Sequence, residues 1–358
     1  MSRFPVLLIL AASAAVAQSI SIEEYEPKST LVVPQHPVPR AKYPFIDVHN
    51  HQRGGSPGLA ERLVKDMDAL NMRIMVNLSG GYGERLQANV AALKGRYPDR
   101  FAVFANIDFS GIDEPGYGAR AARQLEDDVR HGAQGLKIFK PFGMDLKDGQ
   151  GRRIPVDDPR FDQVFETCAR LKIPVLIHTG EPRALFDPMD KYNERWLELK
   201  LYPGRGRPPE RYPTFDALMA EQHRLFARHP HTTFIDAHLG WYGNDLARLG
   251  ALLDKLPNVN TEIAAVVEEL GRQPRFARQW FERYQDRVMF GKDTWRPSEY
   301  PTYFRILESA DEYFDHDRKY HGMWKVYGLD LPDRVLRKLY YENALRIIPG
   351  LSAAGFPK

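Results

Sequence analysis

Short runs of apolar and β-branched residues alternate along the chain with segments that carry a helical pattern. Eight such runs occur, at residues 43–49, 73–78, 101–108, 135–139, 174–178, 232–238, 259–264 and 287–291. The segments between them place apolar residues three and four positions apart, for example in 84–97 and 215–229, which is the period of a helix with one buried face. Strands that alternate with helices in this way indicate a parallel sheet.

Eight strand–helix units within about 250 residues predict an α/β fold of the closed (β/α)8 TIM-barrel type. The alternative is an open doubly wound sheet, which usually carries a glycine-rich phosphate loop after its first strand. No such loop follows residues 43–49. We therefore predict one barrel domain over residues 43–350.

Two regions exceed what a barrel needs. Residues 181–213 form a long insertion after the fifth predicted strand, and we expect it on the face where barrel active sites lie. Residues 332–348 have a helical pattern, and we expect this C-terminal extension to pack on the outside of the barrel.

The beginning of the chain predicts export. Residues 1–17 combine Arg3, an apolar stretch and the small-x-small site Ala15-Val16-Ala17, which is the form of a secretory signal peptide. The alternative is a buried N-terminal helix. Residues 18–42 are polar and rich in proline, and we expect an extended lead-in. We expect a periplasmic or extracellular protein, with no other segment long and apolar enough to span a membrane.

Composition narrows the classes of partner. The chain has 358 residues, of which 43% are hydrophobic, enough for one large domain or two medium ones. A net charge of +3 does not indicate nucleic acid or an anionic membrane as partner. The single cysteine, Cys168, excludes an internal disulfide and is expected to be a buried structural thiol. We expect a small-molecule substrate, and homo-oligomerisation is left open.

Histidine and aspartate gather at the ends of the predicted strands, which all point to one face of a parallel barrel. His49 and His51 end the first strand, His178 the fifth and His238 the sixth, and Asp293 follows the eighth. Residues two apart on a strand point the same way, so the first pair can present both imidazoles to one point. Neutral imidazole with a carboxylate suits zinc and its neighbours. We predict three histidines and the aspartate as ligands of one divalent ion, and the remaining histidine as a general acid or base.

The other histidines of the barrel region carry no such pattern. They flank helix ends or lie in charged stretches, and all are expected at the surface. They are His131, His223, His229, His231, His316 and His321.

At this point the chain resembles the amidohydrolase superfamily, specifically its amidohydrolase-2, decarboxylase-like branch. The resemblance covers about residues 43–348 and rests on FIDVHNH (45–51), GLKIFK (135–140), VLIHTGEP (175–182), FIDAHLGW (234–241) and FGKDTW (290–295). It implies that His49, His51, His178 and Asp293 hold one metal, usually zinc. It also implies that His238 acts as acid or base beside the metal-bound water. In hydrolytic relatives the aspartate also shuttles a proton, so the resemblance implies His238 and Asp293 as catalytic residues.

Five further residues are candidates for binding substrate or supporting the site. Lys137 lies where binuclear relatives carry a carbamylated lysine that bridges two metals. We favour the other interpretation, in which Lys137 is a cation that binds a substrate carboxylate or supports the site, since a buried ammonium needs a partner. Glu262 ends the seventh strand and either contacts substrate, orients a neighbour or forms a salt bridge at the rim. Asp47 lies one layer below the histidine pair and is expected to support it. Trp241 is expected to wall the pocket. Arg183 contributes to a basic insertion that either receives an anionic or aromatic substrate or is a solvated loop.

Three functions follow from these residues. We expect a metal-dependent hydrolase in which activated water attacks an ester, lactone or amide carbonyl. The alternative is a lyase of the same architecture that decarboxylates or hydrates an unsaturated or aromatic acid. Some lyases of that kind replace the first histidine of the pair with a carboxylate, so the intact His49/His51 pair favours hydrolysis. A non-enzymatic barrel protein is the third possibility, and five intact site residues argue against it.

Overall fold

The computed structural model describes residues 19–53, 56 and 58–357, and the chain divides into two compact units, residues 1–32 and 33–358. The predicted signal peptide, residues 1–17, lies outside the described residues. Residues 19–32 contain one turn and otherwise neither helix nor strand. No helix within the described residues has the length and apolar character needed to cross a membrane.

The second unit is built on parallel strands in two hydrogen-bonded groups. One group has the order β1-β2-β3 and the other β4-β5-β6-β7-β8-β9. The strands are β1 (Phe45–Asn50), β2 (Met72–Asn77), β3 (Phe101–Val103), β4 (Ala105–Asn106), β5 (Leu136–Ile138), β6 (Val175–Ile177), β7 (Phe234–Asp236), β8 (Val259–Glu262) and β9 (Val288–Met289). Each predicted run coincides with a strand, except that the run at 101–108 is divided between β3 and β4.

The two groups join into a closed barrel at two places. Phe104 alone separates β3 from β4, so these two short strands act as one. On the other side the backbone N–H of Val48 donates to the carbonyl of Phe290 at 2.9 Å. Asn50 and Asp293 form a parallel bridge at the same seam. Strand pairing therefore runs once around the unit, and the predicted (β/α)8 barrel is confirmed.

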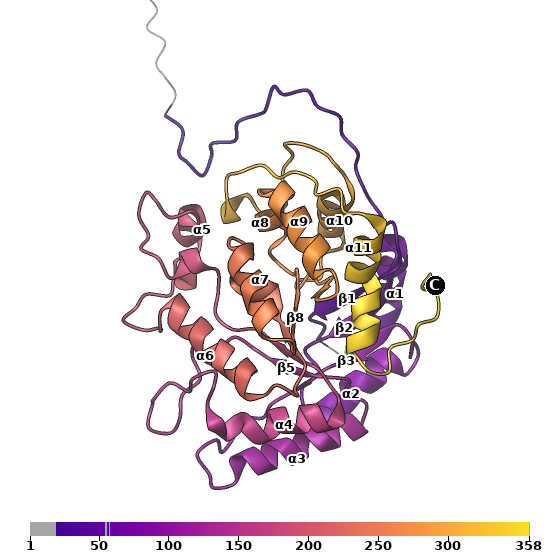
Figure 1. Cartoon of the computed structure of the whole chain (residues 1–358), viewed down its shortest axis with the longest axis vertical. Coiled ribbons are helices and arrows are strands. Elements are labelled where there is room, and N and C mark those ends of the chain that lie inside the picture. Colours follow the sequence, from indigo (N-terminus) through magenta and orange to yellow (C-terminus); the bar gives the residue numbers. More distant parts are fainter. Residues whose placement is uncertain (1–18, 54–55, 57, 358) are drawn as a thin grey trace, which may run out of the picture. The chain divides into compact units, whose positions relative to one another are not determined.

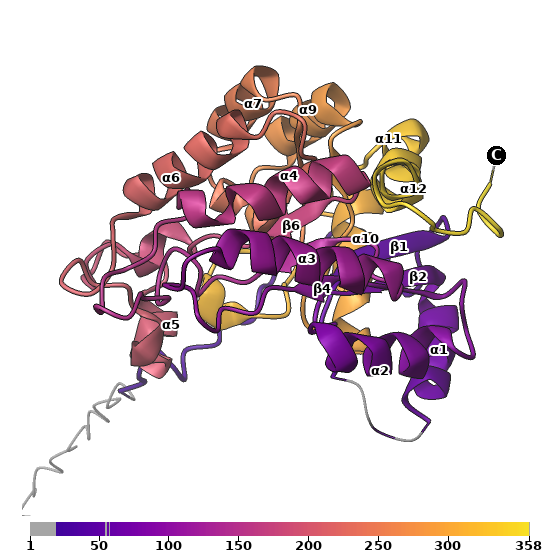
Figure 2. The same cartoon turned by 90° about the horizontal axis from the view of Figure 1, so that it is seen from below.

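Helices follow the strands and bury the apolar faces that the sequence predicts. The longer ones are α1 (Leu59–Leu70), α2 (Gly83–Lys94), α3 (Tyr117–Arg130), α4 (Asp162–Leu171), α6 (Phe215–Arg228), α7 (Leu246–Lys255), α9 (Pro274–Tyr284) and α10 (Tyr300–Glu308). Figures 1 and 2 show α3 and α4 side by side on the outside of the strands. Helix α6 begins at a capping residue, because the Thr214 hydroxyl accepts a hydrogen bond from the backbone N–H of Ala217 at 3.2 Å. Cys168 is buried in α4, as expected.

The C-terminal extension packs against the seam of the barrel. It comprises α11 (Asp333–Arg337), a π-helical turn (Lys338–Glu342) and α12 (Asn343–Ile347). The backbone N–H of Phe290 donates to the carbonyl of Leu339 at 2.9 Å. The Tyr340 ring lies 5.9 Å from that of Phe45 in β1, measured between ring centroids. The extension therefore covers β1 and β9 from outside, as the sequence predicts.

Buried ion pairs anchor the insertion after β6. It contains α5 (Trp196–Leu201) and lies beside α8 (Val267–Gly271), the short helix that follows β8. Arg195 is 3% exposed and contacts Glu198 of α5 at 3.0 Å and Glu269 of α8 at 3.3 Å. Because α8 follows a strand end, these pairs place the insertion at the carboxyl face of the barrel.

Three histidines expected at the surface are buried. His229 contacts Asp162 at 3.0 Å, and His321 contacts Glu268 at 2.7 Å. His316 donates a ring hydrogen bond to the carbonyl of Gly322 at 3.0 Å. The prediction was wrong for all three residues. The partners of His229 and His321 are tertiary neighbours, whereas the partner of His316 lies only six residues away in the chain. His131 caps the end of α3 and is exposed, as expected.

Candidate metal centre

Three predicted ligands converge where the barrel closes. Nε2 of His51 lies 3.3 Å from Nε2 of His49 and 3.4 Å from Oδ1 of Asp293. Nε2 of His49 lies 3.7 Å from the same Asp293 oxygen. Donor atoms held tetrahedrally at zinc-like bond lengths are about 3.3 Å apart. The spacing of these three atoms therefore fits ligands of one ion.

The remaining two histidines adjoin this group. Ligand atoms of His49, His238 and Asp293 all lie within 4.8 Å of one another. His178 contacts the group through His238, since its Nδ1 lies 3.2 Å from Nε2 of His238. Nε2 of His178 is buried without a hydrogen-bond partner among the described residues. The fold thus brings all five predicted residues together. Their division into ligands and acid or base stays a prediction.

Glu262 at the end of β8 supports two of the histidines. Its Oε1 accepts a hydrogen bond from Nδ1 of His49 at 3.0 Å and one from the backbone N–H of His238 at 2.6 Å. Its Oε2 accepts from the backbone N–H of Ala264 at 2.6 Å. Because Nδ1 of His49 is the donor, its Nε2 keeps a free lone pair toward the centre. Of the roles considered for Glu262, its contacts match that of orienting neighbours.

His238 begins an unusual left-handed turn. The φ angles of His238, Leu239, Gly240 and Trp241 are 59°, 54°, 57° and 57°. This conformation costs roughly 1–2 kcal/mol for each residue other than glycine, and such strain often marks functional sites. Nδ1 of His238 donates to the carbonyl of Ala264 at 2.7 Å, which leaves Nε2 facing the centre. The Trp241 ring stacks on that of His238 at 4.5 Å and 25°.

Asp47 braces the backbone below the ligands. Its Oδ1 accepts from the backbone N–H groups of His49 at 3.0 Å and Lys292 at 3.1 Å. Its Oδ2 accepts from Nδ2 of Asn50 at 2.9 Å and from the Tyr300 hydroxyl at 2.7 Å. Burial raises the pKa of Asp47 to about 6 even though these hydrogen bonds oppose the shift. Asp47 thus contacts the backbone of a predicted ligand, its role as a support of the metal stays a prediction, and Tyr300 is a partner that no sequence pattern signals.

Burial keeps the imidazoles of His49 and His51 neutral. It lowers the pKa of His51 to about 4 and holds the pKa of His49 well below the usual value, with the charge of Lys137 acting in the same direction. Burial also opposes ionisation of Asp293, but the neighbouring His49 and the other histidines outweigh it and hold the pKa of that carboxyl well below its usual range. Neutral imidazoles beside an ionised carboxylate are the protonation states that a divalent ion requires.

Lys137 on β5 is a buried amine beside the centre. It is 1% exposed, and its Nζ has no hydrogen-bond partner among the described residues. Burial lowers its pKa to about 7, while the charges of Asp293 and Glu262 act in the opposite direction. The Phe139 ring lies 5.5 Å from Nζ. Sequence reasoning singled out Lys137 but missed Phe139, although it lies two residues later on the same face.

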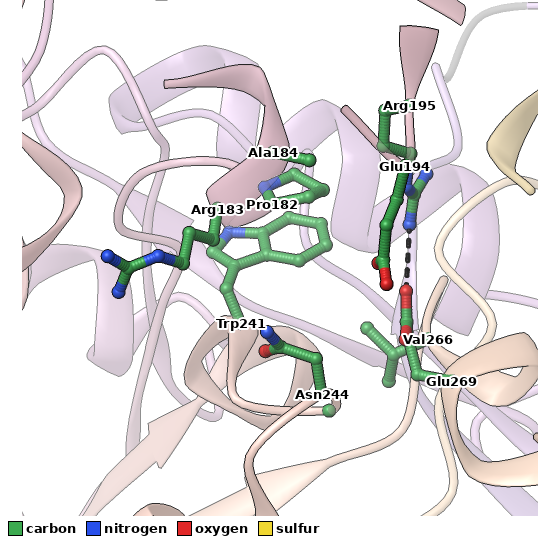
Figure 3. Close-up of a pocket in the computed structure, with 10 residues that line it drawn as sticks. Pro182, Arg183, Ala184, Glu194, Arg195, Trp241, Asn244, Val266 and Glu269 are labelled. Carbon is green, nitrogen blue, oxygen red and sulfur yellow. Dashed lines mark hydrogen bonds and ion pairs between the residues drawn. The ribbon is translucent and has the colours of Figure 1, made fainter. Parts of the chain in front are cut away.

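Arg183 does not reach the metal centre. Its guanidinium lies 3.4 Å from Asp216, and its side chain is half-exposed. Figure 3 shows it pointing away from the indole of Trp241 in a pocket that Asn244 and Glu269 also line. The free space there is about 30 Å³, enough for water but not for a substrate ring. Trp241 therefore links this pocket to His238, whereas Arg183 stays at its outer side.

Comparisons with known proteins agree with this geometry. A family model described as Amidohydrolase matches residues 46–350. Among solved structures, 2,6-dihydroxybenzoate decarboxylase from Rhizobium is 15% identical and superposes with a TM-score of 0.56 over 85% of this chain and 98% of that chain. A dihydroxybenzoic acid decarboxylase from Polaromonas, with bound manganese and 2-nitroresorcinol, is 14% identical with a TM-score of 0.54 over 85% and 96%. No curated sequence matches the chain.

A third solved structure is the 5-carboxyvanillate decarboxylase from Novosphingobium aromaticivorans, in complex with manganese and 4-hydroxy-3-methoxy-5-nitrobenzoic acid. It is 16% identical, covers 85% of this chain and 96% of its own, and has a TM-score of 0.51. At these identities the likeness concerns the fold.

Proposed function

This chain belongs to the amidohydrolase family, and from that premise we propose that it is a metal-dependent lyase that decarboxylates a small aromatic or unsaturated acid without an oxidant. The sequence favoured a hydrolase. The solved structures of similar fold named above are decarboxylases, and this supports the lyase alternative.

The observation that carries the proposal is the unpartnered buried amine of Lys137. A bound divalent ion and a protonated Lys137 would contribute three positive charges. Asp293 and Glu262, the two carboxylates whose charges act on Lys137, would contribute two negative ones. A substrate carboxylate would balance the remaining charge and give the amine the partner that its burial demands.

The residues fit a divalent ion, which His49, His51 and Asp293 would hold together with His178 or His238. When bound, such an ion would act as a Lewis acid toward the oxygens of a substrate. Zinc is the expectation from the sequence, and manganese is bound in two of the similar decarboxylases. Imidazole and carboxylate donors suit both ions.

Decarboxylation breaks the bond between the carboxylate and its neighbouring carbon. Carbon dioxide leaves, the electron pair stays on that carbon, and a proton must be added there. Nδ1 of His238 is held by the carbonyl of Ala264, so Nε2, which lies 3.2 Å from Nδ1 of His178, would carry this proton and deliver it from a fixed position. Lys137 would orient the carboxylate before the bond breaks.

Hydrolysis of an ester, lactone or amide is the second candidate, and Asp293 favours it. An ionised carboxylate at 3.4 Å and 3.7 Å from ring nitrogens of the His51/His49 pair suits a base that takes a proton from water.

Product analysis separates the two functions. The purified protein, loaded in turn with Zn²⁺ and Mn²⁺, would be incubated with hydroxybenzoates and with their methyl esters. We expect carbon dioxide and the parent phenol from the acids, dependent on the metal. Release of methanol from the esters with no carbon dioxide from the acids would contradict the lyase and favour the hydrolase.

We further propose export of the mature chain, supported by the composition of residues 1–17. Cell fractionation with N-terminal sequencing tests it, and an intact Arg3 on a cytosolic protein would contradict it.

A further inference from the structure

Phe139 stands between the buried amine and solvent. It directly follows β5 and comes two residues after Lys137, so the two side chains lie on the same face of the strand. The side chain of Lys137 is buried, whereas Phe139 is 36% exposed. The strand thus sets an amine in a lower layer and a phenyl ring in the layer above it.

Partly exposed residues of the metal centre show where a ligand can reach it, and His51 and Asp293 are two of them, with His178 a third. The side chains of His51 and Asp293 are 28% and 31% exposed, whereas that of His49 is fully buried. The Phe139 ring lies 5.6 Å from the His51 ring, with 33° between their planes. Phe139 is the only exposed large apolar residue in the described part of the chain that has a ring contact with one of these histidines. A ligand that enters past His51 therefore meets the phenyl ring.

We propose that Phe139 is a specificity-determining residue that selects a flat, unsaturated ring attached to the carboxylate held by Lys137, an inference that rests on the proposed function. The substrate ring would pack against Phe139, and its carboxylate would reach Lys137 below. A phenyl ring gains from such an arrangement beyond the burial of apolar area, because its quadrupole favours offset or edge contacts with another ring. A saturated ring of similar size gains only from the burial of area.

Benzoate and cyclohexanecarboxylate are a matched pair of probes, since they share a six-membered ring and a carboxylate but differ in the flat face. Titration calorimetry on the metal-loaded full-length protein would measure both affinities. We expect wild type to bind benzoate about 2- to 12-fold more tightly, the range typical of aromatic pairs. Phe139→Leu, which keeps an apolar side chain, is expected to reduce this ratio to about 1. Phe139→Tyr is expected to retain it.

Metal content and melting temperature serve as controls, and a partly exposed site should tolerate both variants. In turnover, the leucine variant should raise KM for an aromatic acid with little change in kcat. A ratio near 1 in wild type, or an unchanged ratio in Phe139→Leu, would overturn the inference. The binding experiment does not depend on turnover. A protein that prefers benzoate through Phe139 but releases no carbon dioxide would therefore refute the proposed lyase activity and leave the role of Phe139 intact. A protein that releases carbon dioxide, but whose benzoate-to-cyclohexanecarboxylate affinity ratio is the same in wild type and Phe139→Leu, would refute only the role of Phe139.

Discussion

His49 and Glu262 form a fully buried hydrogen bond of 3.0 Å between residues 213 positions apart in the chain. The same carboxylate oxygen also accepts the backbone N–H of His238 at 2.6 Å. One side chain at the end of β8 therefore sets the tautomer of a predicted ligand and the position of a predicted acid or base. Changes at Glu262 should affect both.

Replacing Glu262 with glutamine should weaken metal binding by about 10- to 100-fold, the usual cost of losing a partner that orients a ligand. The amide removes the negative charge, and its NH2 group cannot accept the Ala264 N–H. Metal titration followed by mass spectrometry would measure the change. Glu308→Gln is a control, because Glu308 is a partly buried glutamate that accepts a hydrogen bond, from Tyr340, away from the centre. Equal metal affinity in wild type and Glu262→Gln would contradict the supporting role.

Removing the metal should abolish activity and lower stability. The folded protein already holds the ligand atoms together, whereas the unfolded chain does not. A free ion concentration of 100 times the dissociation constant should therefore stabilise the folded protein by about 2.7 kcal/mol. Melting curves with chelator and with added Zn²⁺ or Mn²⁺ measure this. Metal analysis should find one ion per chain if Lys137 is a free amine. Two ions per chain would instead indicate the bridging carbamate. In the His178→Ala variant, added metal should raise the melting temperature less than in wild type.

Lys137 and Lys292 are two buried lysines that should respond in opposite ways to the same replacement. Lys292 is paired with Glu299 at 2.6 Å, and Lys292→Met should cost about 3 kcal/mol of unfolding free energy by leaving that carboxylate with weaker partners. Lys137 has no hydrogen-bond partner among the described residues, so Lys137→Met should leave stability unchanged or raised. Urea unfolding tests both. Lys137→Met should also raise KM for an acid, and an unchanged KM would exclude its carboxylate-binding role.

Glu268 should give the protein a pH-dependent stability. Burial alone would raise its pKa, but the hydrogen bond from His321 and the charge of Arg195 lower it to about 2. Since the folded pKa lies below the unfolded value near 4.5, the stabilisation is fully present above about pH 4.5 and is lost as the pH falls toward 2. Glu268→Gln should therefore cost about 3 kcal/mol at pH 7. Urea unfolding at several pH values should show the difference shrinking in acid, and a constant difference would contradict this account.

The periodic pattern of the sequence was sufficient for the barrel. Apolar runs such as 174–178 and the helical segments between them are local features, so they could be read without tertiary contacts. The position of His49, His51, His178, His238 and Asp293 at strand ends was equally local. In a parallel barrel all these ends meet on one face, and the convergence of the five residues followed from that geometry alone.

The supports of the centre depended on tertiary structure. Sequence left three roles open for Glu262, and only the approach of β8 to β1 and β7 decided among them. Tyr300 and Ser79, which lies 2.9 Å from His51, carried no signal, because partners far apart in sequence leave no periodic trace. For the same reason His229 and His321 were expected at the surface.

The sequence by itself determined the order of the strands along the chain, the face of the barrel on which the candidate site residues lie and the types of those residues. These properties follow from the spacing of side chains, which repeats every two residues in a strand and about every 3.6 residues in a helix. Each segment encodes this spacing by itself. Tertiary structure alone decided which lone pairs face the centre, which amine lacks a hydrogen-bond partner among the described residues and which ring lies beside that amine. These properties arise from contacts between segments, such as that of Glu262 with His49, and exist only once the barrel has closed.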